Sequence, residues 1–169
     1  LSSVQTMSKL CLILVLALAA VVAGQSGARL NSGRCSAAKP LINKVVAYVF
    51  CASNPRLKRR PRLFVINLFR KNIRSRKFGR ALNHRQLLFK ALKRSVKQAR
   101  SYGRAEIRGK TLIRKLTKIR KQCWLNLFDR MDRNGNDFVG VIEFYRFYRR
   151  TMQRANCRKI FPGKVFKAE

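Results

Sequence analysis

The chain has 169 residues, which is the length of one small domain with or without an additional N-terminal segment. Hydrophobic residues make up 47% of the chain, and this excludes a protein that is disordered throughout. The charge is unusual, because 40 lysines and arginines face 6 acidic residues and give a formal net charge of +34. So few carboxylates argue against an enzyme built on a carboxylate pair. Self-repulsion at this charge disfavours a core large enough for a bulky cofactor.

The N-terminal region has the layout of a secretory signal peptide. Met7 is the expected translation start, and an apolar run from Leu10 to Ala23 follows the single positive charge of Lys9. A membrane-spanning helix needs about 20 apolar residues, and no second long apolar run follows, so we expect no transmembrane span. The alternative is an uncleaved membrane anchor. We expect residues 1–24 to be upstream sequence plus signal peptide, and the mature protein to be secreted and extracellular.

Apart from Cys11 in the apolar run, the chain has four cysteines: Cys35, Cys51, Cys123 and Cys157. An even number in a secreted chain predicts two disulfides, and the sequence leaves all three possible connectivities open. The cysteines are too widely spaced for a zinc knuckle. The one histidine, His84, is expected to be a solvated surface residue, so a zinc site is disfavoured.

Apolar residues at spacings of three and four predict an almost wholly helical protein. A short helix is expected to begin near Pro40 and to end at the Asn54–Pro55 pair. The further predicted helices cover about 63–73 (apolar face Leu63, Ile66, Phe69 and Ile73), 84–100, 111–131 and 141–154. The basic run 56–60 is expected to be either a solvated turn or a site for a protease that cleaves after basic residues.

The acidic residues cluster in one segment. Asp129, Asp132, Asp137 and Glu143 lie within fifteen positions of one another. Counted from Asp132, side-chain oxygens occupy positions 1, 3 and 5, a β-branched residue occupies position 8, and Glu143 occupies position 12, with predicted helices on both sides. This is the spacing of an EF-hand calcium loop, and the chain resembles that family over about residues 112–155.

The resemblance implies a Ca²⁺ site with five ligand residues: Asp132, Asn134, Asn136, Phe138 (through its backbone carbonyl) and Glu143. Calcium takes six to eight oxygen ligands in flexible geometry, which a tight loop of this kind can supply. Gly140 at position 9 would leave one ligand position to water. Glu143, in the first turn of the following helix, would close the site with both carboxylate oxygens.

The loop departs from the family pattern at position 6, where Asp137 replaces the usual glycine. Asp can adopt the left-handed conformation that this position needs, at a cost of about 1 kcal/mol. Arg130, Arg133 and Arg146 lie nearby in sequence and oppose a cation. We therefore expect weak binding, about 10⁻⁴–10⁻³ M, as in extracellular calcium modules. The alternative is a loop that keeps the fold and binds no metal.

EF-hands commonly occur in pairs, so residues 75–86 are a candidate for a degenerate partner loop. Leu82 would then lie at position 8 and Gln86 at position 12. Basic residues in its interior would prevent calcium binding, and the alternative is an ordinary basic turn. The chain thus divides into residues 1–24, a basic N-terminal region 25–60, a basic helical region 61–110, an EF-hand domain 111–155 and a C-terminal tail 156–169.

The charge of a secreted chain points to extracellular polyanions and away from specific nucleic-acid binding. The expected partners are the calcium ion and acidic polysaccharides, acidic matrix proteins or a mineral surface; membrane contact is a further option. The signal peptide, single EF-hand and basicity together resemble secreted EF-hand proteins of the mollusc shell matrix, which implies a biomineralisation role. The alternative is a cationic membrane-disrupting antimicrobial protein, or a gamete protein similar to basic helical sperm proteins of marine snails. An enzyme is not expected, because one histidine and few acids cannot supply a nucleophile, a base and an orienting group.

Overall fold

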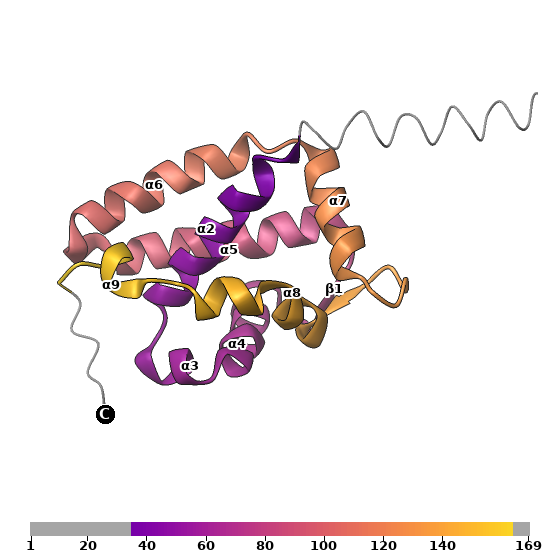
Figure 1. The fold of residues 1–169 in the computed structure, drawn as a ribbon, viewed down its shortest axis with the longest axis horizontal. Coiled ribbons are helices and arrows are strands. Elements are labelled where there is room, and N and C mark those ends of the chain that lie inside the picture. Colours follow the sequence, from indigo (N-terminus) through magenta and orange to yellow (C-terminus); the bar gives the residue numbers. More distant parts are fainter. Residues whose placement is uncertain (1–34, 164–169) are drawn as a thin grey trace, which may run out of the picture. The chain divides into compact units, whose positions relative to one another are not determined.

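The structure, a computed structural model, describes residues 35–163. The predicted signal peptide and the end of the predicted C-terminal tail, residues 164–169, lie outside the described residues. Residues 37–163 belong to one compact unit, in which helices pack around a shared apolar core (Figure 1).

The helices in chain order are α2 (Ala38–Ala52), α3 (Pro55–Arg59), α4 (Pro61–Ile73), α5 (Ala81–Gln98), α6 (Arg104–Thr117), α7 (Lys121–Met131), α8 (Val141–Gln153) and α9 (Cys157–Ile160), with a short 3-10 helix η2 (Arg100–Tyr102) after α5. Two short strands, β1 (Lys77–Phe78) and β2 (Val139–Gly140), form one antiparallel sheet. The prediction of a mostly helical domain is confirmed. The sheet was not predicted, because two-residue strands leave no periodic pattern.

Prolines set the starts of two N-terminal helices. Pro55 and Pro61 are the first residues of α3 and α4, where the missing proline N–H costs no helical hydrogen bond. Asn54 caps α3, because its side chain accepts a hydrogen bond from the Arg56 N–H at 3.0 Å. The predicted end of the first helix at Asn54–Pro55 is therefore confirmed, and the basic run that follows it is largely helical.

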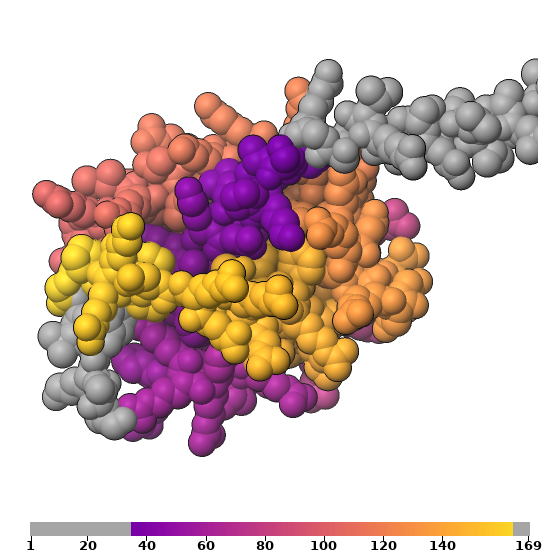
Figure 2. All heavy atoms as spheres, in the orientation of Figure 1, coloured from indigo at the N-terminus to yellow at the C-terminus, as the bar shows by residue number. Residues whose placement is uncertain are grey.

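Helix α5 is the central element, since it packs against α2, α4, α6 and α7. Its buried stripe includes Leu88, Ala91 and Leu92, as the spacing predicted. The predicted face of α4 is only partly right, because Leu63 is 41% exposed while its neighbour Phe64 is buried. Helices α8 and α9 also lie against α2, as the yellow and indigo atoms in Figure 2 show.

The prediction of one continuous helix over 111–131 is wrong. The chain leaves the helix after Thr117 and starts α7 at Lys121. Here the Ile119 N–H bonds to the carbonyl three residues earlier, on Leu116, which tightens the end of α6. The break allows α6 to lie along α5, while α7 turns away and packs against α5 and α8 (Figure 1).

Helix α6 approaches its neighbours most closely at Gly109. A Cβ atom at this position would lie 2.4 Å from Val96 Cγ2 and 2.6 Å from Tyr48 Oη, so only glycine fits without movement. The Tyr48 hydroxyl donates a hydrogen bond to the Ala105 carbonyl at 2.8 Å. Burial, with a smaller contribution from the Glu106 charge, raises the pKa of Tyr48 to about 12. These contacts fix α6 against α2 and α5.

Disulfides link distant parts of the chain. Cys51 in α2 is bonded to Cys157 in α9, with a sequence separation of 106 residues. Cys35 and Cys123 are disulfide-bonded as well, so the four cysteines predicted to pair are all oxidised. Such bonds are compatible with an extracellular protein. Within residues 35–163, no helix has the length and apolar character needed to cross a membrane.

Candidate metal centre

The candidate site is the loop between α7 and α8, which projects from one end of the helical unit (Figure 1). Asp132 directly follows α7 as its C-cap, and the chain then turns through residues 133–138 before it enters strand β2. Glu143 lies in the first turn of α8. The residues predicted as ligands are therefore carried by the end of one helix, a loop and the start of the next helix.

Three of these side chains turn their oxygens toward the loop backbone. The Asp132 carboxylate accepts hydrogen bonds from the Asn136 N–H at 3.3 Å and the Asp137 N–H at 2.8 Å. Asn134 Oδ1 accepts from the same Asn136 N–H at 3.2 Å, and Asn136 Oδ1 accepts from the Phe138 N–H at 3.0 Å. Because Asp132 and Asn134 share one donor, their oxygens lie on the same side of the loop.

Glu143 closes the loop. One of its carboxylate oxygens accepts a hydrogen bond from the Arg133 N–H at 3.2 Å, and the other accepts from the Gly140 N–H at 3.0 Å. The second bond also caps α8, whose first N–H groups have no partner within the helix. The Glu143 carboxylate thus joins the beginning of the loop to its end, beside Asp132.

Asp137, the departure from the family pattern, faces a different partner. Its φ of +62° confirms the predicted left-handed conformation. Its carboxylate forms an ion pair with Arg80 at 3.1 Å, in which both side chains are about two-thirds exposed. The ring of Phe138 is also exposed and lies under Lys77, whose Nζ is 4.5 Å from the ring centroid. The Asp137 carboxylate is therefore held toward the neighbouring loop.

That neighbouring loop, residues 74–80 between α4 and α5, supports the site. Its strand β1 pairs with β2, so that Phe78 lies opposite Val139 and Lys77 opposite Gly140. The predicted alignment of a partner loop over 75–86 is wrong, because residues from Ala81 onward are helical and Leu82 is 55% exposed in α5. Phe78, and not Leu82, lies opposite Val139 at position 8 of the candidate calcium loop.

Both loops rest on a set of buried rings that we call the aromatic cluster: Phe69, Phe78, His84, Trp124, Phe128, Phe144 and Tyr148. Phe78 is near its centre, with ring centroids 5.4 Å from Phe69 and 6.3 Å from both Phe128 and Phe144. The cluster contains residues from α4, α5, α7 and α8 as well as β1. It therefore fixes the two helix–loop–helix segments to each other.

The prediction that His84 is a solvated surface residue is wrong, because its side chain is fully buried in this cluster. Its Nε2 lies 3.2 Å from the Tyr148 hydroxyl, and its ring stacks on Phe78 at 5.5 Å. Burial lowers the pKa of His84 to about 3, so the ring is neutral at physiological pH. The sequence did contain a signal, because His84 lies three to four residues before Leu87 and Leu88, on the buried face of α5.

The donor set at the loop is suited to a hard cation. Between residues 35 and 163, no three His, Cys, Asp or Glu side chains converge as a metal-binding group, and the loop itself directs two carboxylates and two amides inward. Oxygen donors of this kind suit calcium or magnesium and do not suit zinc or copper. Comparisons with protein-family models, with curated proteins and with solved structures find no match for this chain.

Proposed function

We propose that this chain is a secreted, strongly basic calcium-binding protein of an extracellular, mineralising matrix, and that residues 132–143 bind Ca²⁺ as an EF-hand loop. One observation carries the calcium part of the proposal. The Glu143 carboxylate spans the loop from the Arg133 N–H to the Gly140 N–H. It does so beside the inward oxygens of Asp132 and its neighbours, so the loop is ordered around the side chains that would hold the ion.

Calcium would take its oxygens from the side chains of Asp132, Asn134, Asn136 and Glu143 and from the backbone carbonyl of Phe138. The hydrogen bonds that these oxygens already accept do not prevent this. Each carboxylate oxygen has more than one lone pair, so it can keep its bond to a backbone N–H and still face a cation. The N–H groups would then act as a rigid inner frame that holds the ligands in position.

The affinity is expected to be low. Only Asp132 and Glu143 would bring negative charge to the ion, since Asp137 is paired with Arg80. The surrounding positive field also opposes a cation. Ligand charge and loop rigidity set calcium affinity in such loops, and two charged ligands in a positive field favour a dissociation constant of about 10⁻⁴–10⁻³ M. That range suits extracellular fluid, where calcium is abundant.

The net charge of +34 supports the matrix part of the proposal. Basic helix faces would hold acidic polysaccharides, acidic matrix proteins or a mineral surface through many contacts that salt weakens. The disulfides would keep these faces in place outside the cell. A calcium loop on the same domain would bring the ion to the polyanion that the faces bind.

The calcium site is tested by calorimetric titration of the oxidised protein at physiological salt, with two variants. Glu143→Gln keeps the size of the side chain and removes its charge. Asp129→Asn removes a charge of the same sign from an exposed position on α7 outside the loop. We expect one saturable site in the parent and in Asp129→Asn, and binding at least about tenfold weaker in Glu143→Gln.

A flat titration of the parent up to about 10 mM, beyond the range of extracellular modules, would contradict the calcium proposal. Equal affinity of the parent and Glu143→Gln would show that binding occurs elsewhere. Thermal unfolding of each variant without calcium separates a lost ligand from a lost fold.

A membrane-disrupting function is the second candidate. Exposed apolar side chains near cations favour it, above all Ile107, which is 64% exposed on α6 and lines a pocket together with Lys44, Arg108 and Lys115. This function would produce leakage of anionic vesicles that depends on Ile107 and is indifferent to Glu143→Gln. If the protein causes no leakage of anionic vesicles, the membrane-disrupting function is excluded.

A further inference from the structure

A pocket with both polar and apolar lining lies on the side of the domain built by the N-terminal helices. Its volume is about 460 Å³, and it is bounded by the end of α2, α3, α4, α5 and η2. The side chains that matter for its chemistry are Asn54, Asn67, Lys71, Asn72, Arg94 and Gln98. A volume of this size is within the range of small-ligand sites.

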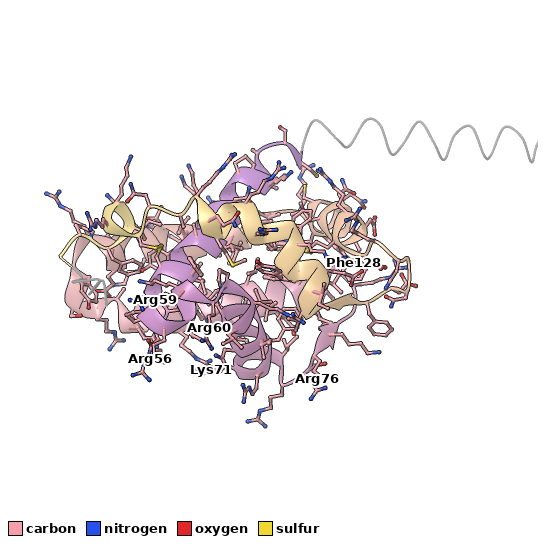
Figure 3. The ribbon with its side chains drawn as sticks, turned by 60° about the horizontal axis from the view of Figure 1, so that its bottom comes forward. Arg56, Arg59, Arg60, Lys71, Arg76 and Phe128 are labelled. Carbon is pink, nitrogen blue, oxygen red and sulfur yellow. A yellow bond between two sulfur atoms is a disulfide. The ribbon has the colours of Figure 1, made fainter. Side chains whose placement is uncertain are left out.

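The charge around this pocket has one sign. The first acidic residue of the whole chain is Glu106, so the elements that line the pocket contain no carboxylate. Lys71 and Arg94 line it directly, and the Arg94 guanidinium donates a hydrogen bond to the Lys71 carbonyl at 3.2 Å. Figure 3 shows that Arg56, Arg59 and Arg60 lie in the same region as Lys71. Among the residues that the structure describes, an anionic ligand in the pocket would therefore meet the cations Lys71 and Arg94 and no lining carboxylate.

One buried group in the pocket requires a hydrogen-bond donor. Asn72 is 8% exposed, and its amide Nδ2 donates to the Leu68 carbonyl at 2.7 Å. Its Oδ1 is buried and has no hydrogen-bond partner among the described residues. Buried acceptors without a partner are rare, because each one loses its hydrogen bond to water on folding. Asn72 lines the pocket, so a ligand that supplied a donor would satisfy this oxygen once the side chain turned to expose it there.

These two features narrow the class of ligand. A simple sulfate or carboxylate ion has only oxygens that accept hydrogen bonds, so it would satisfy the cations and leave Asn72 Oδ1 unpaired. A sugar hydroxyl can donate to that oxygen, and the amides of Asn54, Asn67 and Gln98 can donate to or accept from other hydroxyls. The pocket therefore suits a ligand that combines hydroxyl groups with an anionic group.

We propose that this pocket binds one anionic sugar unit, sulfated or carboxylated, of an acidic polysaccharide. Lys71 and Arg94 would face the anionic group, and Asn72 Oδ1 would accept a hydrogen bond from a ring hydroxyl. This inference rests on the polysaccharide part of the proposed function and is independent of calcium. It assigns a defined site to a contact that the charge alone would spread over the whole surface.

The test uses the full disulfide-bonded protein and calorimetric titration at physiological salt with a short dextran sulfate oligosaccharide, an alginate oligosaccharide and neutral dextran of matched length. The variants are Asn72→Leu, which removes the acceptor and keeps the branching of the side chain, and Lys71→Ala. Lys90→Ala is the matched control, because Lys90 is an exposed lysine of α5 that does not line the pocket. It lowers the net charge by the same amount as Lys71→Ala.

At least one of the two acidic oligosaccharides is expected to bind the parent protein. We expect about tenfold weaker binding for Asn72→Leu, about fivefold weaker for Lys71→Ala, and less than about twofold change for Lys90→Ala. The melting temperature of Asn72→Leu is expected to stay the same or rise, since a buried unpaired acceptor is removed. Neutral dextran is expected to bind none of the proteins.

Several results would overturn the inference, and they can be told apart. If both pocket variants bind as Lys90→Ala does, the polysaccharide is held by the general surface and the pocket is not its site. If the parent binds neither acidic oligosaccharide, the polysaccharide part of the proposed function fails together with this inference. If single-stranded nucleic acid or phosphatidylserine vesicles bind more tightly and depend equally on Asn72, the ligand class is wrong.

Discussion

The two helix–loop–helix segments, α4 to α5 and α7 to α8, have similar backbone arrangements and differ in charge. In each, a helix leads into a loop with one non-glycine residue at positive φ, Arg74 at +52° in the first and Asp137 at +62° in the second. Each loop then contributes a two-residue strand to the same sheet and continues into a second helix. The first loop carries only basic charges, whereas the second directs the oxygens of Asp132 and Glu143 inward.

The difference shows which features the fold needs and which the proposed chemistry needs. Strand pairing and a buried ring, Phe78 opposite Val139, hold the loops together whatever their charge. Oxygen side chains at the right positions occur in the second loop alone. The basic loop therefore serves as a support, and its Arg80 and Lys77 contact the outer side of the calcium-loop candidate.

The largest expected effect comes from breaking the shared support. Phe78 is 3% exposed and lies inside the aromatic cluster, so Phe78→Ala would leave a cavity and lower the free energy of unfolding by about 3–5 kcal/mol. Phe138, the phenylalanine next to Val139 on the other loop, is 42% exposed. Phe138→Ala would cost less than about 1 kcal/mol, chiefly through lost contact with Lys77. Urea unfolding of the two variants measures the difference.

Similar losses for the two phenylalanine variants would mean that the strand pairing, and not the buried ring, holds the loops together. A loss of calcium binding in Phe78→Ala at a temperature where it remains folded would show that the basic loop also orders the site.

A second prediction concerns the contact between the two segments' second helices, where His84 of α5 meets Tyr148 of α8. Burial lowers the pKa of His84 from 6.5 to about 3 in the folded state. The unfolded chain therefore binds a proton between these pH values while the folded chain does not. Stability is full above about pH 6.5 and falls as the pH decreases, by about 1.4 kcal/mol per pH unit.

The measurement is the free energy of urea unfolding at pH 7 and pH 5, where we expect a decrease of about 2 kcal/mol from this residue. His84 is the single histidine of the chain. His84→Leu is the control, since it cannot titrate and should flatten the dependence even if it is less stable throughout. An equal slope in the parent and in His84→Leu would show that acidic residues cause the effect.

The contrast between the loops also explains what the sequence could predict. The ligand pattern from Asp132 to Glu143 lies in one continuous segment, so its spacing can be recognised from the sequence alone. The hydrogen bonds inside the loop agree with this pattern. The partner of that loop is set by the pairing of Phe78 with Val139. No local pattern marks that pairing, because it depends on how α4, α5, α7 and α8 pack.

Other errors have the same origin. The break after Thr117 contains neither proline nor glycine, so periodicity extended one helix across it. Packing of α6 along α5 and of α7 against α8 decides the break. His84 has an arginine beside it in the sequence, which favours a solvated residue, although its spacing to Leu87 and Leu88 places it on the buried face. In a helix, consecutive residues point to different faces, so a charged residue next to His84 in the sequence says little about whether His84 is buried.

The smallest expected effect concerns the ion pair between the two loops, Arg80 with Asp137. Arg80→Ala would remove a cation next to the site and release Asp137 from its ion pair, so the field at the loop would become more favourable to Ca²⁺. Because both side chains are exposed, water screens the gain, and we expect an affinity increase of about twofold at physiological salt. The increase should be larger at low ionic strength and vanish at about 1 M salt, where the Debye length is about 3 Å.

Calorimetric titrations of the parent, Arg80→Ala and Arg76→Ala at low and high salt would measure this effect. Arg76→Ala removes the same charge from the same loop at another exposed position, so a gain that is specific to Arg80 isolates the contact with Asp137. A lower affinity in Arg80→Ala would reverse the interpretation. The ion pair would then be needed to hold Asp137 in its left-handed conformation. The basic loop would in that case favour calcium binding by ordering the calcium loop, and this effect would exceed the repulsion between its positive charge and the ion.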